Sequence, residues 1–462
     1  MRSESTALAK LPALGANGPY ESRTTEIVTD VTGKPVAQLS LVPWLFAQRS
    51  IRTLRRATPP DPARRRELLT EAGRLFASGT VDGVSPEAYH RTMAEVAGMP
   101  ISIVRDLTGQ VGDYAAAAYD AVHQARPIGA ADSWRDHRTK QGSGVWTRRG
   151  EVLMVHAPAN SPAVHQAWLD ALALGYRVAI RPSQREPFTP YRLVAALRAV
   201  GYGDDQVVLL PTDHPTADRI ISEADVAIAF GGDEVARRYG ASTLIMPFGP
   251  GRSKILLTSG VDAEQHMDTI AESVAGHAGT GCVNATAVFV EGDPAPVAEA
   301  IAKRLGELPS LPPGDERAKL PVRQADTARA VDEYLRGKAG NAKPLPHGSS
   351  VVDELGDGSA VLRPAVFLLD HQDAPQARIE MGFPCVWIVP WKRDGDWLAP
   401  LRGTLALTAL TDDDALIDAL VAEPTIDKIH VGDHATTWTR PGLPHEGYLG
   451  EFLMRTKAVV VD

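Results

Sequence analysis

Two short segments carry the residue types that acyl chemistry needs, with Asn160 in the first and Cys282 in the second, 122 residues later. Residues 156–162 follow an apolar, strand-like run, and residues 279–282 place the thiol after two glycines. A thiol on a glycine-rich turn can attack a carbonyl carbon, and a side-chain amide at a strand end can stabilise the oxyanion that forms. The two segments together therefore suggest an enzyme that works through a thiohemiacetal or a thioester on Cys282, although the spacing alone fits a structural cysteine equally well.

The other motifs favour no competing chemistry. Cys385 lies in an apolar run, which is typical of a small buried side chain. The histidines show no metal-ligand spacing, so no metal site is expected. The chain lacks the Gly-x-Ser-x-Gly motif of serine hydrolases, and no Gly-x-Gly-x-x-Gly follows the first strand. Gly231 and Gly232 follow an apolar run, where small residues allow a cofactor to approach, although a tight turn explains them equally well.

The elements that must position these residues alternate between strands and helices from about residue 145 to 258. The expected strands are short apolar runs at residues 152–155, 177–180, 207–210, 226–230 and 244–247. Amphipathic helical patterns separate these runs, which implies right-handed crossovers and a parallel sheet.

The remaining stretches complete the predicted organisation. Residues 1–22 are expected to be a loose arm, and residues 23 to about 135 to be largely helical. A helix over residues 266–278 is expected to lead to Cys282. Later strands, expected at residues 287–290, 386–389, 404–410 and 429–431, would form a second sheet. At 462 residues the chain is too long for one ordinary core, so two or three domains are expected.

Composition limits the partners and the compartment. The formal net charge is −9, which argues against a nucleic-acid partner. No apolar run approaches the ~18 residues of a membrane span, and residues 1–20 contain no apolar core of a secretory signal. Two cysteines do not make a disulfide framework and fit a reducing compartment, so a cytoplasmic location is expected.

Several motifs, in their order along the chain, resemble those of the aldehyde dehydrogenase superfamily. In that family a strand used in oligomerisation leads into a Pro-Trp-Asn motif, followed by Lys-Pro-Ser/Ala-Glu, Phe-Thr-Gly-Ser, the cysteine motif, Glu-x-Phe-Gly-Pro and a closing strand. The similar stretches here are residues 144–152, 158–162, 181–184, 230–233, 281–282, 380–384 and 450–457.

This resemblance implies an α/β fold with a parallel-sheet cofactor domain, an α/β catalytic domain and oligomerisation strands. It divides the chain into a cofactor-binding domain (23–258, with an oligomerisation strand near 138–150), a catalytic domain (259–430) and a return segment (431–462). Asn160 and Cys282 would be catalytic, and the protein would be a homodimer or homotetramer. The residues that it implies for nicotinamide cofactor binding are Ala157, Pro158, Arg181, Ser183, Gln184, Gly231, Gly232, Asp233, Glu380 and Phe383.

Departures from the family pattern bear on the reaction. Members that oxidise aldehydes have a Glu-Leu-Gly-Gly-Lys segment whose glutamate activates water, whereas residues 246–252 here contain no acid. This segment and the Gly231-Gly232-Asp233-Glu234 turn resemble the acyl-CoA reductase branch, including the enzymes that supply aldehyde for bacterial bioluminescence. That branch implies reduction of an acyl thioester, presented by coenzyme A or a carrier protein, to an aldehyde.

Two alternatives stay open at this point. One is an aldehyde dehydrogenase that works oxidatively. The other is a degenerate member that serves as a binding subunit, because Asp233 would repel a cofactor pyrophosphate unless it turns away or meets Arg252. NADPH is expected as cofactor, with NADH possible, since Gln184 is neutral and Arg181 and Arg185 suit a 2′-phosphate.

Overall fold

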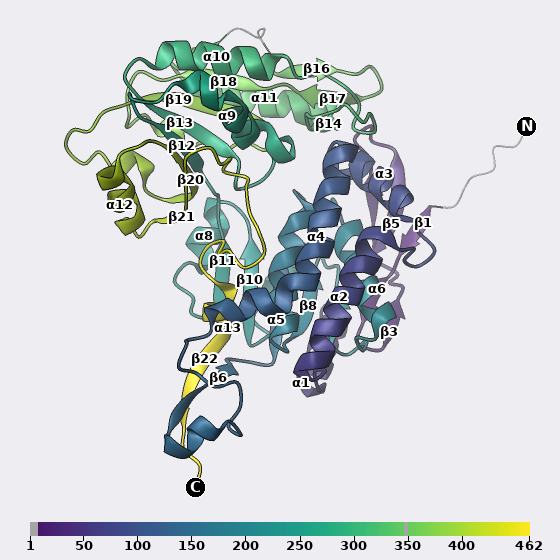
Figure 1. Ribbon diagram of the computed structural model, residues 1–462. Coiled ribbons are helices and arrows are strands. Elements are labelled where there is room, and N and C mark those ends of the chain that lie inside the picture. Colours follow the sequence, from purple (N-terminus) through teal and green to yellow (C-terminus); the bar gives the residue numbers. More distant parts are fainter. Residues whose placement is uncertain (1–7, 346–349) are drawn as a thin grey trace, which may run out of the picture.

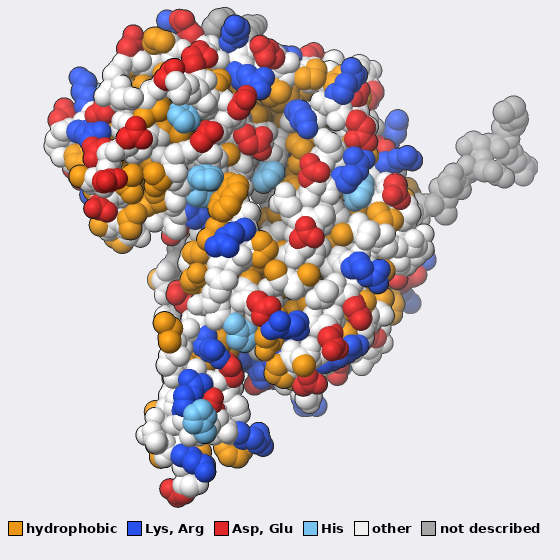
Figure 2. All heavy atoms as spheres, in the orientation of Figure 1, with side chains coloured by type: hydrophobic (Ala, Val, Ile, Leu, Met, Phe, Trp, Pro, Cys, Tyr) orange, Lys and Arg blue, Asp and Glu red, His pale blue; other side chains and the backbone are white. Residues whose placement is uncertain are grey.

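The computed structural model describes residues 8–345 and 350–462. The chain forms two α/β lobes, each built on a seven-stranded sheet, and a two-stranded ribbon that projects from the first lobe (Figure 1). Two three-stranded sheets complete the structure. No helix among the described residues is long and apolar enough to span a membrane. Acidic and basic side chains are interspersed over both lobes on the face shown in Figure 2.

The first sheet has the strand order β11-β10-β7-β8-β9-β2-β3. Its strands are β2 (Ala13–Gly15), β3 (Gly18–Tyr20), β7 (Val152–His156), β8 (Arg177–Arg181), β9 (Val207–Leu209), β10 (Val226–Phe230) and β11 (Ile245–Phe248). The strands from β11 to β9 are parallel, and β2 is antiparallel to both β9 and β3. The five strands predicted from the apolar runs are therefore confirmed, with ends within about one residue.

Helices cover the two faces of this sheet. They are α1 (Trp44–Arg56), α2 (Pro62–Ser78), α3 (Pro86–Ala97), α4 (Ile101–Val122), α5 (Gln166–Ala173), α6 (Phe188–Val200), α7 (His214–Ile220) and α8 (Asp233–Tyr239). Helices α2 and α4 carry the predicted apolar stripes: Leu69 and Phe76 of α2 and Ala118 of α4 are fully buried. The fully buried Trp168 of α5 packs in the same core. Helices α2 and α4 pack on α5, and α2 also packs on α6, while α5 contacts β8 and α6 contacts β9, so the stripes bury an outer helical layer against the helices that cover the sheet.

The N-terminal region differs from the loose arm that was expected. Residues 1–7 lie outside the described part, but β1 (Ala9–Leu11) pairs with β5 (Pro35–Ser40), which also pairs with β4 (Thr25–Thr29). Strands β2 and β3 extend the first sheet. The expectation was wrong from residue 8 onward because β1 and β2 pair with strands farther along the chain, β5 and β9. Residues 25–40 contain the strands β4 and β5 rather than helix.

The second sheet has the order β15-β18-β19-β13-β12-β20-β21. Its strands are β12 (Ser253–Leu257), β13 (Ala285–Glu291), β15 (Lys343–Pro344), β18 (Ala365–Leu368), β19 (Cys385–Trp391), β20 (Thr404–Leu410) and β21 (Ile426–Val431). The helices of this lobe are α9 (Met267–Ala275), α10 (Pro294–Gly306), α11 (Ala325–Ala339) and α12 (Asp414–Ala422). Strand β12 lies before the boundary expected at residue 258, so the chain enters the second sheet between β11 and β12.

Besides the sheet of β1, β5 and β4, two further small sheets lie outside the main ones. One is β14 (Val322–Gln324), β17 (Ser359–Leu362) and β16 (Val352–Glu354), in the order β14-β17-β16. The other is the ribbon, in which β6 (Ser143–Arg148) pairs antiparallel with the C-terminal β22 (Met454–Val459). Helix α13 (Leu449–Leu453) leads directly into β22 and packs on α5, so the chain returns to the first lobe before it ends (Figure 1).

Candidate active site

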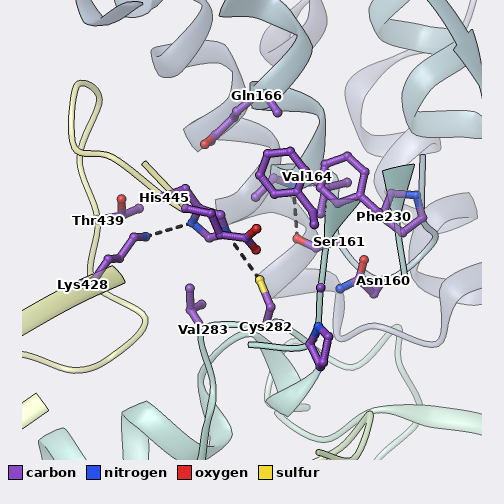
Figure 3. A pocket seen from close by; sticks show the side chains of 18 of the residues that line it. Asn160, Ser161, Val164, Gln166, Phe230, Cys282, Val283, Lys428, Thr439 and His445 are labelled. Atoms are coloured by element: carbon purple, nitrogen blue, oxygen red, sulfur yellow. Dashed lines mark hydrogen bonds between the residues drawn. The ribbon is translucent and has the colours of Figure 1, made fainter. Parts of the chain in front are cut away.

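A cavity of about 1060 Å³ is lined by both lobes and by the loop between β21 and α13. Asn160, which follows β7, and Cys282, which precedes β13, both line it (Figure 3). The two segments that the sequence singled out are therefore brought together. Further lining residues that the arguments below use are Phe248, Glu380, Lys428, His445 and Glu446.

The turn before Cys282 has an unusual backbone. Helix α9 ends at Ala275, earlier than the helix expected to reach residue 278, and His277, Ala278 and Gly279 follow with φ of 52°, 60° and 65°. A Cβ on Gly279 would lie 2.4 Å from the backbone nitrogen of Pro384. Left-handed residues reverse the chain within one turn, which the helical pattern did not predict. The thiol consequently follows a rigid reversal rather than a helix end.

The backbone of Cys282 is fixed by the start of the second sheet. The Ser253 hydroxyl donates a hydrogen bond to the Cys282 carbonyl oxygen at 2.9 Å. A Cβ on Gly251 would lie 1.8 Å from that same oxygen, so only glycine allows the approach. The nucleophile's position is thus set by a contact between two backbones.

Asn160 and the cysteine turn are tied by reciprocal hydrogen bonds. Asn160 Nδ2 donates to the Thr280 carbonyl oxygen at 3.1 Å, and Thr280 Oγ1 donates to the Asn160 carbonyl oxygen at 3.2 Å. An amide nitrogen has two hydrogens, so one remains for an oxygen in the cavity. Among the described residues, the buried Oδ1 of Asn160 has no hydrogen-bond partner. This geometry can orient the amide toward an oxyanion beside Cys282.

Cys282 also contacts an imidazole that the sequence analysis did not single out. Its Sγ lies 3.6 Å from His445 Nε2, and His445 Nδ1 lies 2.9 Å from Lys428 Nζ (Figure 3). The His445 ring also stacks near Phe248, with centroids 6.2 Å apart. Lys428 belongs to the edge strand β21 and His445 to the loop that follows it, so the second sheet supplies one partner and its return loop the other.

Burial dominates the acid–base behaviour of this cluster. Withdrawal from water raises the pKa of Cys282 to about 12, assisted by the Glu380 and Glu446 carboxylates and opposed by Lys428. Burial lowers the pKa of Lys428, and burial followed by the nearby Lys428 charge lowers the pKa of His445 to about 3. All three shifts favour the uncharged forms.

Glu446 is a second group that sequence reasoning missed. Burial, reinforced by Asp427 and opposed by Lys428, raises the pKa of Glu446 to about 8. A carboxyl group with such a pKa can exchange protons near neutral pH. Neither spacing nor a known motif marks residues 428, 445 and 446, since they meet Cys282 only after the C-terminal loop folds back across the cavity.

Some of the predicted cofactor residues line the cavity, and the others lie outside its lining. Pro158, Gly231, Gly232 and Asp233 line the cavity at the carboxyl ends of β7 and β10. Nothing lies within 4 Å of a Cβ built on Gly232, so the backbone there faces open space. Ala157 precedes them, is only 5% exposed and donates its backbone N–H to the Arg181 carbonyl oxygen at 2.9 Å.

Asp233 meets Arg252. The guanidinium Nη2 lies 2.6 and 2.7 Å from the two carboxylate oxygens. An unpaired Asp233 would repel a pyrophosphate, but the ion pair with Arg252 offsets much of the negative charge of Asp233. The observation that motivated a degenerate binding subunit is thereby weakened.

Glu380 and Phe383 differ in whether they line the cavity. Glu380 lines the cavity and accepts the backbone N–H of Arg252 at 2.8 Å, and its pKa is raised chiefly by burial. Phe383 is 1% exposed and packs in the second-sheet core. Its neighbours Met381 and Gly382 line the cavity instead. The prediction that Phe383 contacts the cofactor is therefore corrected, because the swapped order of the motif turns its ring inward.

Arg181, Ser183 and Gln184 lie farther along the same sheet edge. Gln184 Nε2 donates to the Thr212 carbonyl oxygen at 3.0 Å, and Ser183 Oγ accepts the Arg185 backbone N–H at 3.2 Å. Three of the ten buried side-chain atoms without a partner within the described ranges lie at or just beyond the ends of β7, β8 and β9. They are His156 Nε2, Arg181 Nε and Thr212 Oγ1. Unpaired polar atoms at the ends of parallel strands suit a polar ligand such as a dinucleotide.

The described residues contain no group of three or more His, Cys, Asp or Glu side chains that could hold a metal ion.

Two α/β lobes that share one cavity, with a thiol and a side-chain amide in its lining, suit covalent chemistry at a carbonyl carbon. The family model of the aldehyde dehydrogenase family matches residues 63–401, more than half of the chain. The chain belongs to the aldehyde dehydrogenase family. At this level the expected fold and the expected class, an oxidoreductase of the aldehyde dehydrogenase type, are confirmed.

Individual relatives are distant. Malonate-semialdehyde dehydrogenase 2 of Bacillus mycoides is 24% identical over 179 residues, 37% of this chain and 36% of that protein. Aspartate-semialdehyde dehydrogenase 1 of Pseudomonas canavaninivorans is 23% identical over 304 residues, 63% of this chain and 60% of that protein. An aldehyde-dehydrogenase-like protein of Sinorhizobium fredii is 24% identical over 45% of this chain and 43% of its own length. The matched part thus spans less than two thirds of these curated relatives.

Solved structures match over nearly the whole chain. The NAD-dependent aldehyde dehydrogenase from Sinorhizobium meliloti superposes with a TM-score of 0.84 at 17% identity, covering 98% of this chain and 95% of that one. An NAD⁺ complex of an aldehyde dehydrogenase from Bacillus cereus gives a TM-score of 0.83 at 14% identity, covering 98% and 97%. At such low identity the likeness shows the shared fold.

Proposed function

We propose that this protein is a nicotinamide-dependent reductase that converts an acyl thioester into an aldehyde through an acyl group on Cys282. One observation carries the proposal: the segment packed on the nucleophile has no carboxylate. Gly251 and Ser253 contact the Cys282 carbonyl oxygen, and residues 246–257 contain no Asp or Glu. Without a base for water there, an acyl-Cys282 thioester favours attack by hydride or by a thiol over hydrolysis.

The residues at the cavity fit each step. The Cys282 thiolate attacks the thioester carbonyl and expels the carrier thiol, while Asn160 and the Cys282 backbone N–H stabilise the oxyanion. A bound reduced nicotinamide supplies the hydride that converts the acyl group into a thiohemiacetal. The thiohemiacetal then collapses, which releases the aldehyde and returns the electron pair to Cys282.

The cofactor site in this proposal runs along the carboxyl ends of β7, β8 and β10. Gly231 and Gly232 would allow close approach of the pyrophosphate, and Glu380 would bind the nicotinamide ribose. Arg181, Ser183 and Gln184 would hold the adenosine ribose, with NADPH the preferred form. One of the solved structures that share the fold is an NAD-dependent aldehyde dehydrogenase, so NADH is the form against which this preference is tested.

Assembly and location belong to the same proposal. We place the protein in the cytoplasm, as a homodimer or homotetramer built through β6 and β22, with coenzyme A or a carrier protein presenting the acyl group.

A second function, oxidation of an aldehyde to an acid, is favoured by Glu446. This carboxyl group raises the pKa of Cys282 and has a pKa of about 8 itself, so it can act as a base for water from the loop side of the cavity. Glu446 lies in the loop after β21, far in sequence from residues 246–257 and from Glu234.

Product analysis separates the two functions. Enzyme, aldehyde and NADP⁺ without added thiol should give at most one slow turnover, with the acyl group trapped on Cys282 and detected by intact mass. A panel of acyl-CoA thioesters should then support NADPH oxidation. Rapid multiple turnover to carboxylate that is lost in Glu446→Gln would establish the oxidative function instead.

A further inference from the structure

The strongest unassigned feature of the cavity is the contiguous row of Lys428, His445 and Cys282. The inference drawn from this row rests on the proposed function only in taking Cys282 as the nucleophile. The three groups come from β21, from the following loop and from the turn before β13, and they are joined at 2.9 Å and 3.6 Å (Figure 3). Lys428 Nζ lies beside His445 Nδ1, and Cys282 Sγ lies beside His445 Nε2. The imidazole therefore lies between an amine and a thiol.

We propose that Lys428, His445 and Cys282 form a proton relay that creates the thiolate. The Cys282 S–H proton moves to His445 Nε2 while the Nδ1 proton moves to the neutral Lys428 Nζ, which becomes an ammonium. Proton count and total charge of the three groups are unchanged by this transfer. Lys428 is therefore a positioning residue that acts through the imidazole, and His445 touches the reacting sulfur.

The relay also accounts for the protons that move during acyl transfer. The departing carrier thiolate takes the Nε2 proton, and Lys428 returns its proton to Nδ1, which restores the uncharged row. After hydride transfer and collapse of the thiohemiacetal, the Cys282 thiolate takes one proton from solvent. Each turnover thus consumes one thioester, one reduced nicotinamide and one proton, and releases an aldehyde, a free thiol and the oxidised nicotinamide.

Burial supports the uncharged resting form. It raises the pKa of Cys282 and lowers the pKa values of His445 and Lys428, so each shift is in the direction of the uncharged form. The other charged groups that face the row are Glu380, Glu446 and Asp427. Glu446 has a pKa of about 8, within the pH range of the test below, so a Glu446 variant is needed as a control.

Alkylation by iodoacetamide tests the relay without substrate or cofactor. Because the proton stays within the row, the second-order rate at Cys282 in wild type should be nearly constant between about pH 6.5 and 8.5. In His445→Gln and in Lys428→Met the thiol must lose its proton to water, so the rate should fall ~10–100-fold at pH 7 and rise about tenfold per pH unit. Cys282→Ala gives the background from Cys385.

Control variants assign the effect. His434→Gln replaces an exposed histidine outside the cavity, and its profile should match wild type. Glu446→Gln should keep the flat profile, and loss of the plateau in this variant would overturn the relay in favour of the carboxylate. Wild-type and His445→Gln profiles of equal slope would also overturn it. Circular dichroism melts check folding, and Lys428→Met carries the test if His445→Gln does not fold.

The outcome is independent of the proposed reaction. A protein without thioester reductase activity can still show the flat alkylation profile, and an active reductase can show a sloping one. The two failures are thereby distinguishable.

Discussion

At the scale of single residues, the chemistry depends on one of two thiols. Cys282 lines the cavity, whereas Cys385 is 3% exposed in the second-sheet core. Cys282→Ala should abolish turnover, by on the order of 10⁴-fold or more, because the covalent intermediate cannot form. Cys385→Ala should keep most activity and cost about 1–2 kcal/mol of unfolding free energy. Steady-state rates and denaturant melts of both variants measure this, and equal loss of activity in the two would contradict the assignment.

The cofactor preference is also a residue-scale property. If Arg181 and Arg185 bind a 2′-phosphate, replacing either by Ala should lower kcat/KM for NADPH by ~10–100-fold and leave the value for NADH nearly unchanged, since charge-assisted hydrogen bonds are worth about 1.5–3 kcal/mol. Arg185 is exposed, so its variant separates this effect from misfolding. A preference for NADH that neither substitution changes would refute the proposal.

Sequence reasoning reached only part of the site. Asn160 and Cys282 were identifiable because each lies in a short segment whose own residue types suggest a chemical role. Lys428, His445 and Glu446 were not, since each is ordinary in its own segment and gains a role only from the approach of the C-terminal loop. Phe383 was misassigned because a swap of two positions in a motif exchanges a cavity-lining residue for a core residue.

At the scale of elements, the place where β12 passes the cysteine turn controls the geometry of attack. A Cβ on Gly251 would meet the Cys282 carbonyl oxygen, whereas one on Gly249 would have an ordinary 3.8 Å contact with Ala236 Cβ. Gly251→Ala should therefore displace the nucleophile and lower kcat/KM by roughly 10²-fold. Gly249→Ala is the matched control and should stay near wild type. Comparable losses in both variants would show that the backbone contact does not set the position of the thiol.

The elements themselves were predictable to different degrees. Strands β7, β8 and β10 are buried on both faces and therefore read as continuous apolar runs. The N-terminal strands β1–β5 are only three to six residues long, and β1 and β2 pair with strands farther along the chain, so local pattern did not reveal them. The reversal at residues 277–279 was missed because its left-handed conformation occurs at a histidine and an alanine as well as a glycine.

At the scale of the whole molecule, the projecting ribbon is the candidate for subunit contact. It contains only two strands, and most of β22 is exposed. Such a ribbon is marginally stable alone, and its free edges can pair with another chain. Deletion of residues 454–462 should convert a dimer or tetramer into smaller species in light scattering. An unchanged mass after the deletion would place the subunit contact elsewhere.

The pairing of β6 with β22 has a consequence for synthesis of the chain. Strand β6 leaves the ribosome about 300 residues before its partner, because translation proceeds from the N-terminus. During that interval its edge is open while both lobes are already being completed. A nascent chain is therefore exposed to mispairing until β22 emerges, and a stop codon before residue 454 would leave that edge open permanently.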